Sequence, residues 1–177
     1  MKKARLKKII RFFANGSKMT AYYCYFKRMN KGCNQNDYIC STILECPMKR
    51  KSEDTLTVAQ ELINRKGIFC TQSVHCSYYA VLQRMKYILA NLAKNPIPYD
   101  KQNPDDKSSH EKILEEIKNR IDKPKNGRNF AEEFRLLKND RIKADYTEKQ
   151  FNVDESADCK NRAESLLYKL KSYFGDI

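Results

Sequence analysis

Arg141 and Asp145 are the residues whose type and spacing point most directly to chemistry. Arg141 continues the apolar line of Phe134 and Leu137 on a predicted helix, where an arginine either extends its charged end to water or points into a shared cleft. Asp145 follows four residues later, so its carboxylate can pair with the guanidinium on the same helix face. Two interpretations stay open: a surface ion pair that stabilises the helix slightly, or a guanidinium that Asp145 holds toward a phosphate.

The two histidines, His75 and His110, are the side chains able to exchange protons near neutral pH. His110 is the third residue of Ser108–Glu111, a predicted capping box that begins a helix, so a local structural role competes with a catalytic one. His75 borders a predicted buried helix face and belongs either to the core or to a self-association face. The sequence contains no metal-ligand histidine spacing, nucleotide-loop motif or hydrolase motif, so no metal site and no cofactor are predicted.

The tyrosines and cysteines are explained most simply by packing. Tyr78 and Tyr79 lie in the middle of the most regular apolar stripe and are predicted to be core residues, although a buried tyrosine hydroxyl needs a hydrogen-bond partner. The seven cysteines contain no C-x2-C pair of the kind found in zinc ribbons. Their odd number and the lack of a secretion signal predict reduced thiols in a cytoplasmic protein.

Helical periodicity positions these residues, and no segment after residue 51 alternates as a strand does. The strongest apolar stripe runs from Val74 to Leu92 and ends before the Asn95–Pro98 segment, because proline lacks an amide donor. The sequence from Pro124 to Gly127 is expected to end the third helix. The five predicted helices begin near Ser52 as an N-cap, Val74, Ser108, Asn129, and Asn152 or Asp154. Short connections between amphipathic helices predict an all-α fold, an antiparallel up-and-down bundle of about five helices.

The net charge of +13 is concentrated at the start of the chain. Residues 1–50 hold 12 Lys and Arg against 2 Asp and Glu, whereas the rest of the chain is nearly balanced. We therefore predict a basic N-terminal extension, residues 1–47, and a helical bundle, residues 48–177, that folds on its own. The extension is interpreted as a disordered or interfacial arm that contacts nucleic acid or a membrane, or as an over-long start with Met48 as the true first residue. No apolar run is long enough for a transmembrane segment.

Several motifs in residues 52–174 occur in the order found in HEPN domains. The second helix of that family, with its typical Tyr-Tyr-Ala centre, is similar to SVHCSYYAVLQRMKYIL. The Ser-His start of its next helix is similar to SSHEKI. The family's Arg-x-x-Ala-Asp-Tyr segment and closing helix resemble LLKNDRIKADY and VDESADCKNRAESLLYKL. The common order and spacing make the resemblance fairly specific, and residues 1–47 lie outside it.

The resemblance implies a helical bundle that forms a homodimer and often accompanies a minimal nucleotidyltransferase, as in toxin–antitoxin pairs. Active members of the family are metal-independent ribonucleases with an Arg-x4–6-His motif near the dimer cleft. Arg141 matches that arginine, whereas no histidine follows it at the motif's spacing. Attack by a 2′-hydroxyl needs a group that exchanges protons near neutral pH, so the motif is degenerate unless His110 or His75 reaches Arg141.

Three functional hypotheses follow. The first is a protein that binds a nucleotide, RNA or a nucleotidyltransferase partner at a dimer cleft. Its ligand-binding residues are predicted to be Arg141, Asp145, Tyr146, Tyr78 and Tyr79. The second is an active ribonuclease toxin with a displaced base, for which Arg141 and His110 are the predicted catalytic residues. The third is a non-enzymatic helical adaptor dimer whose basic arm binds nucleic acid or a membrane.

Overall fold

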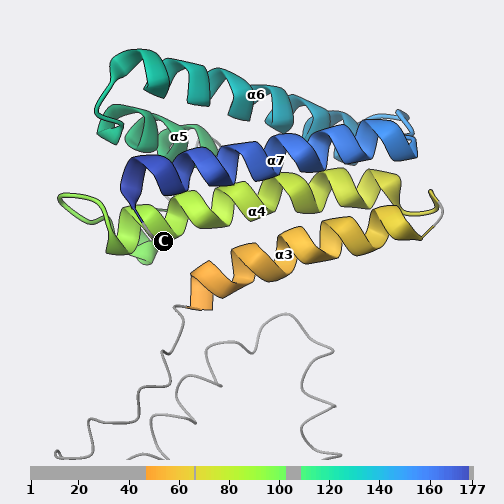
Figure 1. Ribbon diagram of the computed structural model, residues 1–177, viewed down its shortest axis with the longest axis horizontal. Coiled ribbons are helices and arrows are strands. Elements are labelled where there is room, and N and C mark those ends of the chain that lie inside the picture. Colours follow the sequence, from red (N-terminus) through yellow and green to blue (C-terminus); the bar gives the residue numbers. More distant parts are fainter. Residues whose placement is uncertain (1–46, 66, 103–108, 176–177) are drawn as a thin grey trace, which may run out of the picture. The chain divides into compact units, whose positions relative to one another are not determined.

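The computed structural model describes residues 47–65, 67–102 and 109–175, all within the second of two units into which the chain divides, Leu44–Ile177. Its helices are α3 (Pro47–Asn64), α4 (Cys70–Asn91), α5 (Ser109–Arg120), α6 (Pro124–Tyr146) and α7 (Val153–Phe174), with a 3-10 turn, η2, at Tyr99–Lys101. These described segments contain no strand, so the prediction of an all-α helical bundle is confirmed (Figure 1). The predicted basic extension and the Ser108 cap fall almost entirely outside the described residues.

Helices α3 and α4 form an antiparallel hairpin joined by buried serines (Figure 1). Ser52, predicted as an N-cap, is instead buried inside α3, where its hydroxyl donates to the carbonyl of Ala80 at 2.7 Å. Ser73 donates in the same way from α4 to the carbonyl of Ala59 at 2.8 Å. Small side chains let the two backbones approach, and each buried hydroxyl finds an acceptor. The helix therefore begins at Pro47, ahead of the predicted start.

Helix α4 is the centre of the core, since it packs against α3, α5, α6 and α7. The predicted stripe is buried from Val74 to Ile88, and the ring of Tyr78 stacks on that of Phe134 of α6 at 5.1 Å between centroids. The prediction that Leu92 belongs to this stripe is wrong, because α4 ends at Asn91 and Leu92 is exposed. None of the described helices is both long and apolar enough to cross a bilayer.

Helix α5 runs in the same direction as α4, so the predicted antiparallel alternation of neighbouring helices is wrong for this pair. It begins where His110 meets Tyr78, halfway along α4, and ends where Arg120 donates to the carbonyl of Asn95 beyond the end of α4. Helix α6 then returns antiparallel to α5 (Figure 1). His110 is therefore placed against the middle of the central helix.

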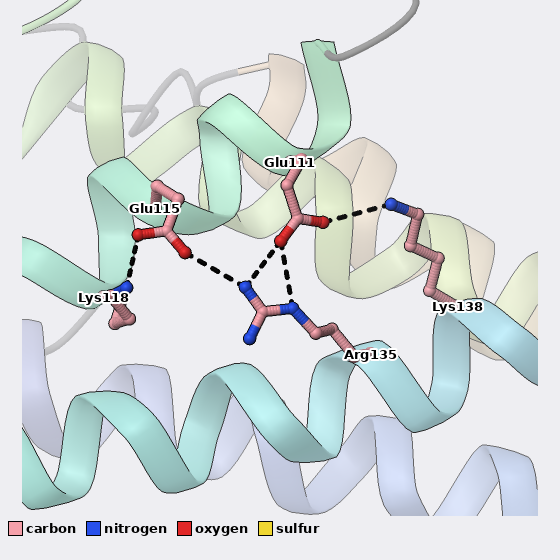
Figure 2. A network of polar contacts seen from close by, with 5 residues as sticks. All are labelled: Glu111, Glu115, Lys118, Arg135 and Lys138. Atoms are coloured by element: carbon pink, nitrogen blue, oxygen red, sulfur yellow. Dashed lines mark hydrogen bonds and ion pairs between the residues drawn. The ribbon is translucent and has the colours of Figure 1, made fainter.

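A charged network fixes α5 against α6 (Figure 2). Arg135 of α6 donates to Glu111 at 2.6 and 3.0 Å and to Glu115 at 3.0 Å, and Lys138 donates to Glu111 at 3.1 Å. Burial alone raises the pKa of Glu111, but hydrogen bonds from Arg135 and Lys138 outweigh it and lower the pKa below its usual value. Arg135 and Lys138 of α6 are thus paired with carboxylates of α5 before the helix reaches Arg141.

The predicted break at Pro124 is instead the first turn of α6, so the prediction that this helix starts near Asn129 is wrong. Proline suits this position, because the first turn of a helix needs no backbone donor. Gly127 is buried where α6 crosses the end of α5, and a Cβ there would lie 2.7 Å from the carbonyl oxygen of Lys118. The glycine allows the two helices to approach closely rather than ending one of them.

Helix α7 begins at Val153 with Asn152 as its N-cap, which agrees with the first of the two predicted starts. The side chain of Asn152 accepts from the amide of Glu155 at 2.8 Å, and Glu155 accepts in return from the amide of Asn152 at 3.0 Å, which is a capping box. The hydroxyl of Ser156 then donates to the carbonyl of Cys70 at 3.0 Å. The first turns of α7 and α4 therefore lie side by side, and the loop after α6 is held close to the start of α4.

Candidate functional site

Two residue pairs meet where α4 and α6 face each other. His75 and Tyr79 are one turn apart on α4, and Arg141 and Asp145 are one turn apart on α6, so each pair occupies one helix face. The Nδ1 atom of His75 lies 3.0 Å from the carboxylate of Asp145, and Nη2 of Arg141 donates to the hydroxyl of Tyr79 at 2.7 Å. The His75 and Tyr79 rings are 4.5 Å apart, and Arg141 and Asp145 pair at 2.7 Å, which closes a ring of contacts. We call these four residues the α4–α6 site.

Arg141 is held as a cation among aromatic rings. Its guanidinium carbon lies 5.3 to 5.5 Å from the ring centroids of Tyr78, Tyr79 and Tyr146, and its side chain is 14% exposed. Burial alone lowers the pKa of Arg141, but its interactions with Tyr79 and Asp145 outweigh burial and raise the pKa above its ordinary value. The Nε–H does not point at the carboxylate oxygen 2.7 Å away, so that contact is an ion pair rather than an aligned hydrogen bond.

One nitrogen of Arg141 remains available for a ligand. Nη2 is bonded to Tyr79 and Nε is paired with Asp145, while Nη1 has no hydrogen-bond partner within the described part of the chain. A guanidinium nitrogen with its hydrogens unpaired is a strong donor to phosphate or carboxylate oxygens. Of the two interpretations of Arg141 from the sequence, the arrangement favours a guanidinium positioned by Asp145 for an anion.

His75 has the geometry of a proton-transfer group. Its Nδ1 lies 3.0 and 3.1 Å from the two oxygens of Asp145, and a carboxylate can only accept, so Nδ1 carries the hydrogen of the neutral ring. The lone pair is then on Nε2, and the side chain is 45% exposed. A carboxylate that fixes the tautomer and orientation of a histidine in this way is a recurring arrangement in acid–base catalysis.

His110 is held differently. Its Nδ1 lies 3.0 Å from the hydroxyl of Tyr78, which is fully buried, and burial raises the pKa of that tyrosine so that the hydroxyl keeps its proton. Burial lowers the pKa of His110, and neighbouring cations that include Arg141 lower it further. His110 is therefore neutral at pH 7, and its Nδ1 is occupied by the contact with Tyr78. Its catalytic role stays a prediction, and the geometry favours His75 for proton transfer.

The structure brings most of the predicted ligand-binding residues to one place. Tyr78 is a core residue that touches the guanidinium of Arg141 with its ring, Tyr79 bonds to it, and Tyr146 lies exposed at the end of α6. His75 was predicted only as a substitute base, on the condition that the fold brings it to Arg141, and His110 was the histidine assigned to the site. His75 is 70 positions from its partner Asp145, and only the one-turn spacing from Tyr79 could have suggested that it faces the same way.

Metal-ligand clusters and cavities are the other features of the described residues that could mark a site. No group of three or more His, Cys, Asp or Glu side chains there is placed to hold a metal ion. Two shallow cavities of about 280 and 310 Å³ lie elsewhere, the first between α3, α4 and α7 and the second at the turn between α5 and α6. Neither is lined by a residue of the α4–α6 site, which is instead partly open at the surface through His75.

Comparison with known proteins gives no assignment: the chain matches no family model, no curated protein and no solved structure at a significant level. The resemblance to HEPN domains rests on the sequence motifs alone. The function must therefore be argued from the α4–α6 site.

Proposed function

We propose that this protein is a metal-independent ribonuclease that cleaves RNA at the α4–α6 site. The observation that carries the proposal is the position of Asp145, whose carboxylate contacts both the imidazole of His75 and the guanidinium of Arg141. A base and an anion-binding cation are thereby held beside each other. Cleavage of a phosphodiester by its own 2′-hydroxyl needs these two groups in fixed relation.

In the proposed reaction, Nη1 of Arg141 donates to a non-bridging oxygen of the scissile phosphate. Nε2 of His75 takes the proton of the adjacent 2′-hydroxyl, and the 2′-oxygen bonds to phosphorus as the bond to the 5′-oxygen breaks. The 5′-oxygen receives the proton back from His75, directly or through water, and the products are a 2′,3′-cyclic phosphate and a 5′-hydroxyl. Arg141 stabilises the negative charge that builds up on the phosphate oxygens.

The family resemblance supports the same reaction class. Its motif expects a histidine shortly after the arginine, whereas in this chain Asp145 is the side chain that pairs with Arg141 one turn later. His75, which comes from the facing helix, binds that carboxylate. We therefore place the displaced base at His75 and favour the active ribonuclease over the hypothesis of a purely binding protein.

The test incubates the full-length protein with single-stranded RNA in EDTA and analyses the ends of the products. We expect cyclic phosphate ends from the wild type, and cleavage slower by roughly 100-fold or more in His75→Gln and Arg141→Ala, with helical circular dichroism unchanged. The matched control is His110→Gln, which alters the other histidine of the region and should keep most of the activity. The assignment of the base is refuted if His110→Gln abolishes cleavage and His75→Gln does not.

The proposal also includes the partners that the resemblance implies, a second copy of the chain and a nucleotidyltransferase. Expression of the wild type should arrest growth, and His75→Gln should relieve the arrest if the ribonuclease is a toxin. Sedimentation of the purified protein tests the homodimer. RNA that is bound but left intact by the wild type would instead support the first hypothesis, a binding component with an inactive site.

A further inference from the structure

Tyr146 presents an open aromatic face beside the α4–α6 site. It is the last residue of α6 and is 72% exposed, while the guanidinium carbon of Arg141 lies 5.4 Å from its ring centroid. The cation lies over the ring, yet most of the residue remains open to solvent. Ile142, one turn earlier on α6, is also exposed and widens the apolar surface.

Single exposed apolar residues are common on protein surfaces and need no function. The position of Tyr146 is what distinguishes it. The ring directly follows Asp145 in the chain and contacts the guanidinium that we expect to bind phosphate. A nucleotide carries an anionic phosphate and a flat base a few ångströms apart, so the two neighbouring features match the two parts of one ligand.

We infer that Tyr146 is a base-stacking subsite, which takes the nucleobase of a nucleotide next to the phosphate bound by Arg141. The inference rests on the proposed function for the position of that phosphate. Every base has a flat face, so stacking of this kind tolerates many sequences, but it requires a base that is unpaired. Tyr146 therefore selects for an unpaired nucleotide at the site of cleavage.

The simplest competing explanation is that Tyr146 only covers Arg141 and keeps water from it. The two explanations predict opposite changes in oligonucleotide binding when the ring of Tyr146 is removed. Removal of a stacking platform weakens the binding of an oligonucleotide, whereas removal of a cover leaves the guanidinium more accessible and keeps or strengthens binding.

The experiment titrates the full-length protein into a short 2′-O-methyl RNA that contains 2-aminopurine, whose fluorescence falls when it stacks on an aromatic ring. The 2′-O-methyl group blocks the attacking oxygen, so the probe stays intact whether or not the protein is a ribonuclease. We expect Tyr146→Ala to weaken binding roughly 5- to 100-fold and to abolish the quenching. Tyr146→Phe keeps the ring and should behave like the wild type.

The matched control is Tyr168→Ala, because Tyr168 is 75% exposed and lies on α7, outside the α4–α6 site. It should bind the probe as the wild type does, and since all variants share residues 1–46, differences between them report the substituted tyrosine. Equal or tighter binding by Tyr146→Ala overturns the inference, as does an equal loss in Tyr168→Ala, or a wild type that does not bind.

The ribonuclease proposal can fail separately from the stacking subsite. His75→Gln should bind the 2′-O-methyl probe with unchanged quenching, because the histidine acts on the 2′-hydroxyl and not on the base. A wild type that leaves unmodified RNA intact, yet binds the probe in a Tyr146-dependent way, would refute the ribonuclease and uphold the stacking subsite.

Discussion

Replacement of Asp145 by Asn tests the α4–α6 site most sharply, because it keeps the shape of the side chain and changes what it can donate. The carboxylate accepts from Nδ1 of His75 and so places the lone pair on Nε2. An asparagine amide that turns its NH2 group toward the imidazole donates to Nδ1 instead, and the hydrogen of the neutral ring moves to Nε2. The atom that we propose as the base then has no lone pair.

The effect on stability should be moderate. Asp145 and Arg141 pair at 2.7 Å with side chains only 19% and 14% exposed, so the ion pair is worth more than a pair at the surface. Arg141 keeps its hydrogen bond to the hydroxyl of Tyr79 in the variant. We expect a loss of about 1–2 kcal/mol in the free energy of unfolding, or a melting temperature lower by roughly 4–7 °C. The rate of RNA cleavage should fall by about 100- to 10,000-fold, the usual contribution of a positioned base.

Two measurements separate these effects. Long-range proton–nitrogen correlation spectra at pH 8, above the ordinary titration range of histidine, report which ring nitrogen of His75 carries the hydrogen. The control is Asp140→Asn, since Asp140 also lies on α6, is 23% exposed and pairs with Arg162 at 2.8 Å. It should lower stability similarly and leave the tautomer and the cleavage rate unchanged. A hydrogen on Nε2 already in the wild type, or Asp145→Asn cleaving within about twofold of the wild type, would refute the reasoning.

Three further predictions concern the fold around the site. Burial and neighbouring cations lower the pKa of His110, so below about pH 6.5 the unfolded chain binds more protons than the folded one. The folded protein therefore becomes less stable as the pH is lowered. Between about pH 7.5 and pH 5 the melting temperature of His110→Gln should decrease less than that of the wild type. Gly127→Ala should cost about 1–3 kcal/mol in urea unfolding, because the added Cβ would lie 2.7 Å from the carbonyl oxygen of Lys118; an unchanged midpoint would show that the helices can separate there. Ser52→Ala should cost about 1 kcal/mol through the lost hydrogen bond to the carbonyl of Ala80, and a stabilised variant would contradict this.

Much of the fold could be predicted because helices leave local signals. The helical periodicity of apolar residues identified the five helices of the described part of the chain, and the start of α7 was placed near Asn152 or Asp154, within one residue of its first residue, Val153. The errors occurred where a residue type has two uses. Pro124 reads as a helix breaker or as a first-turn residue, and Ser52 as a cap or as a small buried group between helices. Only the packing of the neighbouring helix decides between these uses, and packing is not visible in the local sequence.

In the candidate site, too, the contact within one helix could be predicted and the contacts between helices could not. Arg141 and Asp145 could be paired in advance, because four residues on a helix bring side chains together. Their partners on α4 could not be predicted, because the contact from His75 to Asp145 spans 70 positions in the sequence and depends on how the two helices are aligned. The position of His110 at a helix start favoured a structural role over the predicted catalytic one, and the fold places its Nδ1 against the buried hydroxyl of Tyr78.

The network of Figure 2 and the α4–α6 site differ in how far their charged groups are exposed and in which polar atoms lack a partner. In the network of Figure 2, the side chains of Arg135 and Glu111 are well exposed. Water therefore hydrates the polar atoms that have no protein partner, and such pairs form with little desolvation cost. Arg141 and Asp145 are largely withdrawn from water, which costs desolvation that pairing alone returns poorly, and apolar side chains at these positions would avoid that cost. The carboxylate of Asp145 holds Arg141 and His75 beside each other. Within the described part of the chain, Nη1 of Arg141 and Nε2 of His75 have no hydrogen-bond partner. A purely structural ion pair has no need of either atom, and a site that binds phosphate and moves a proton needs both.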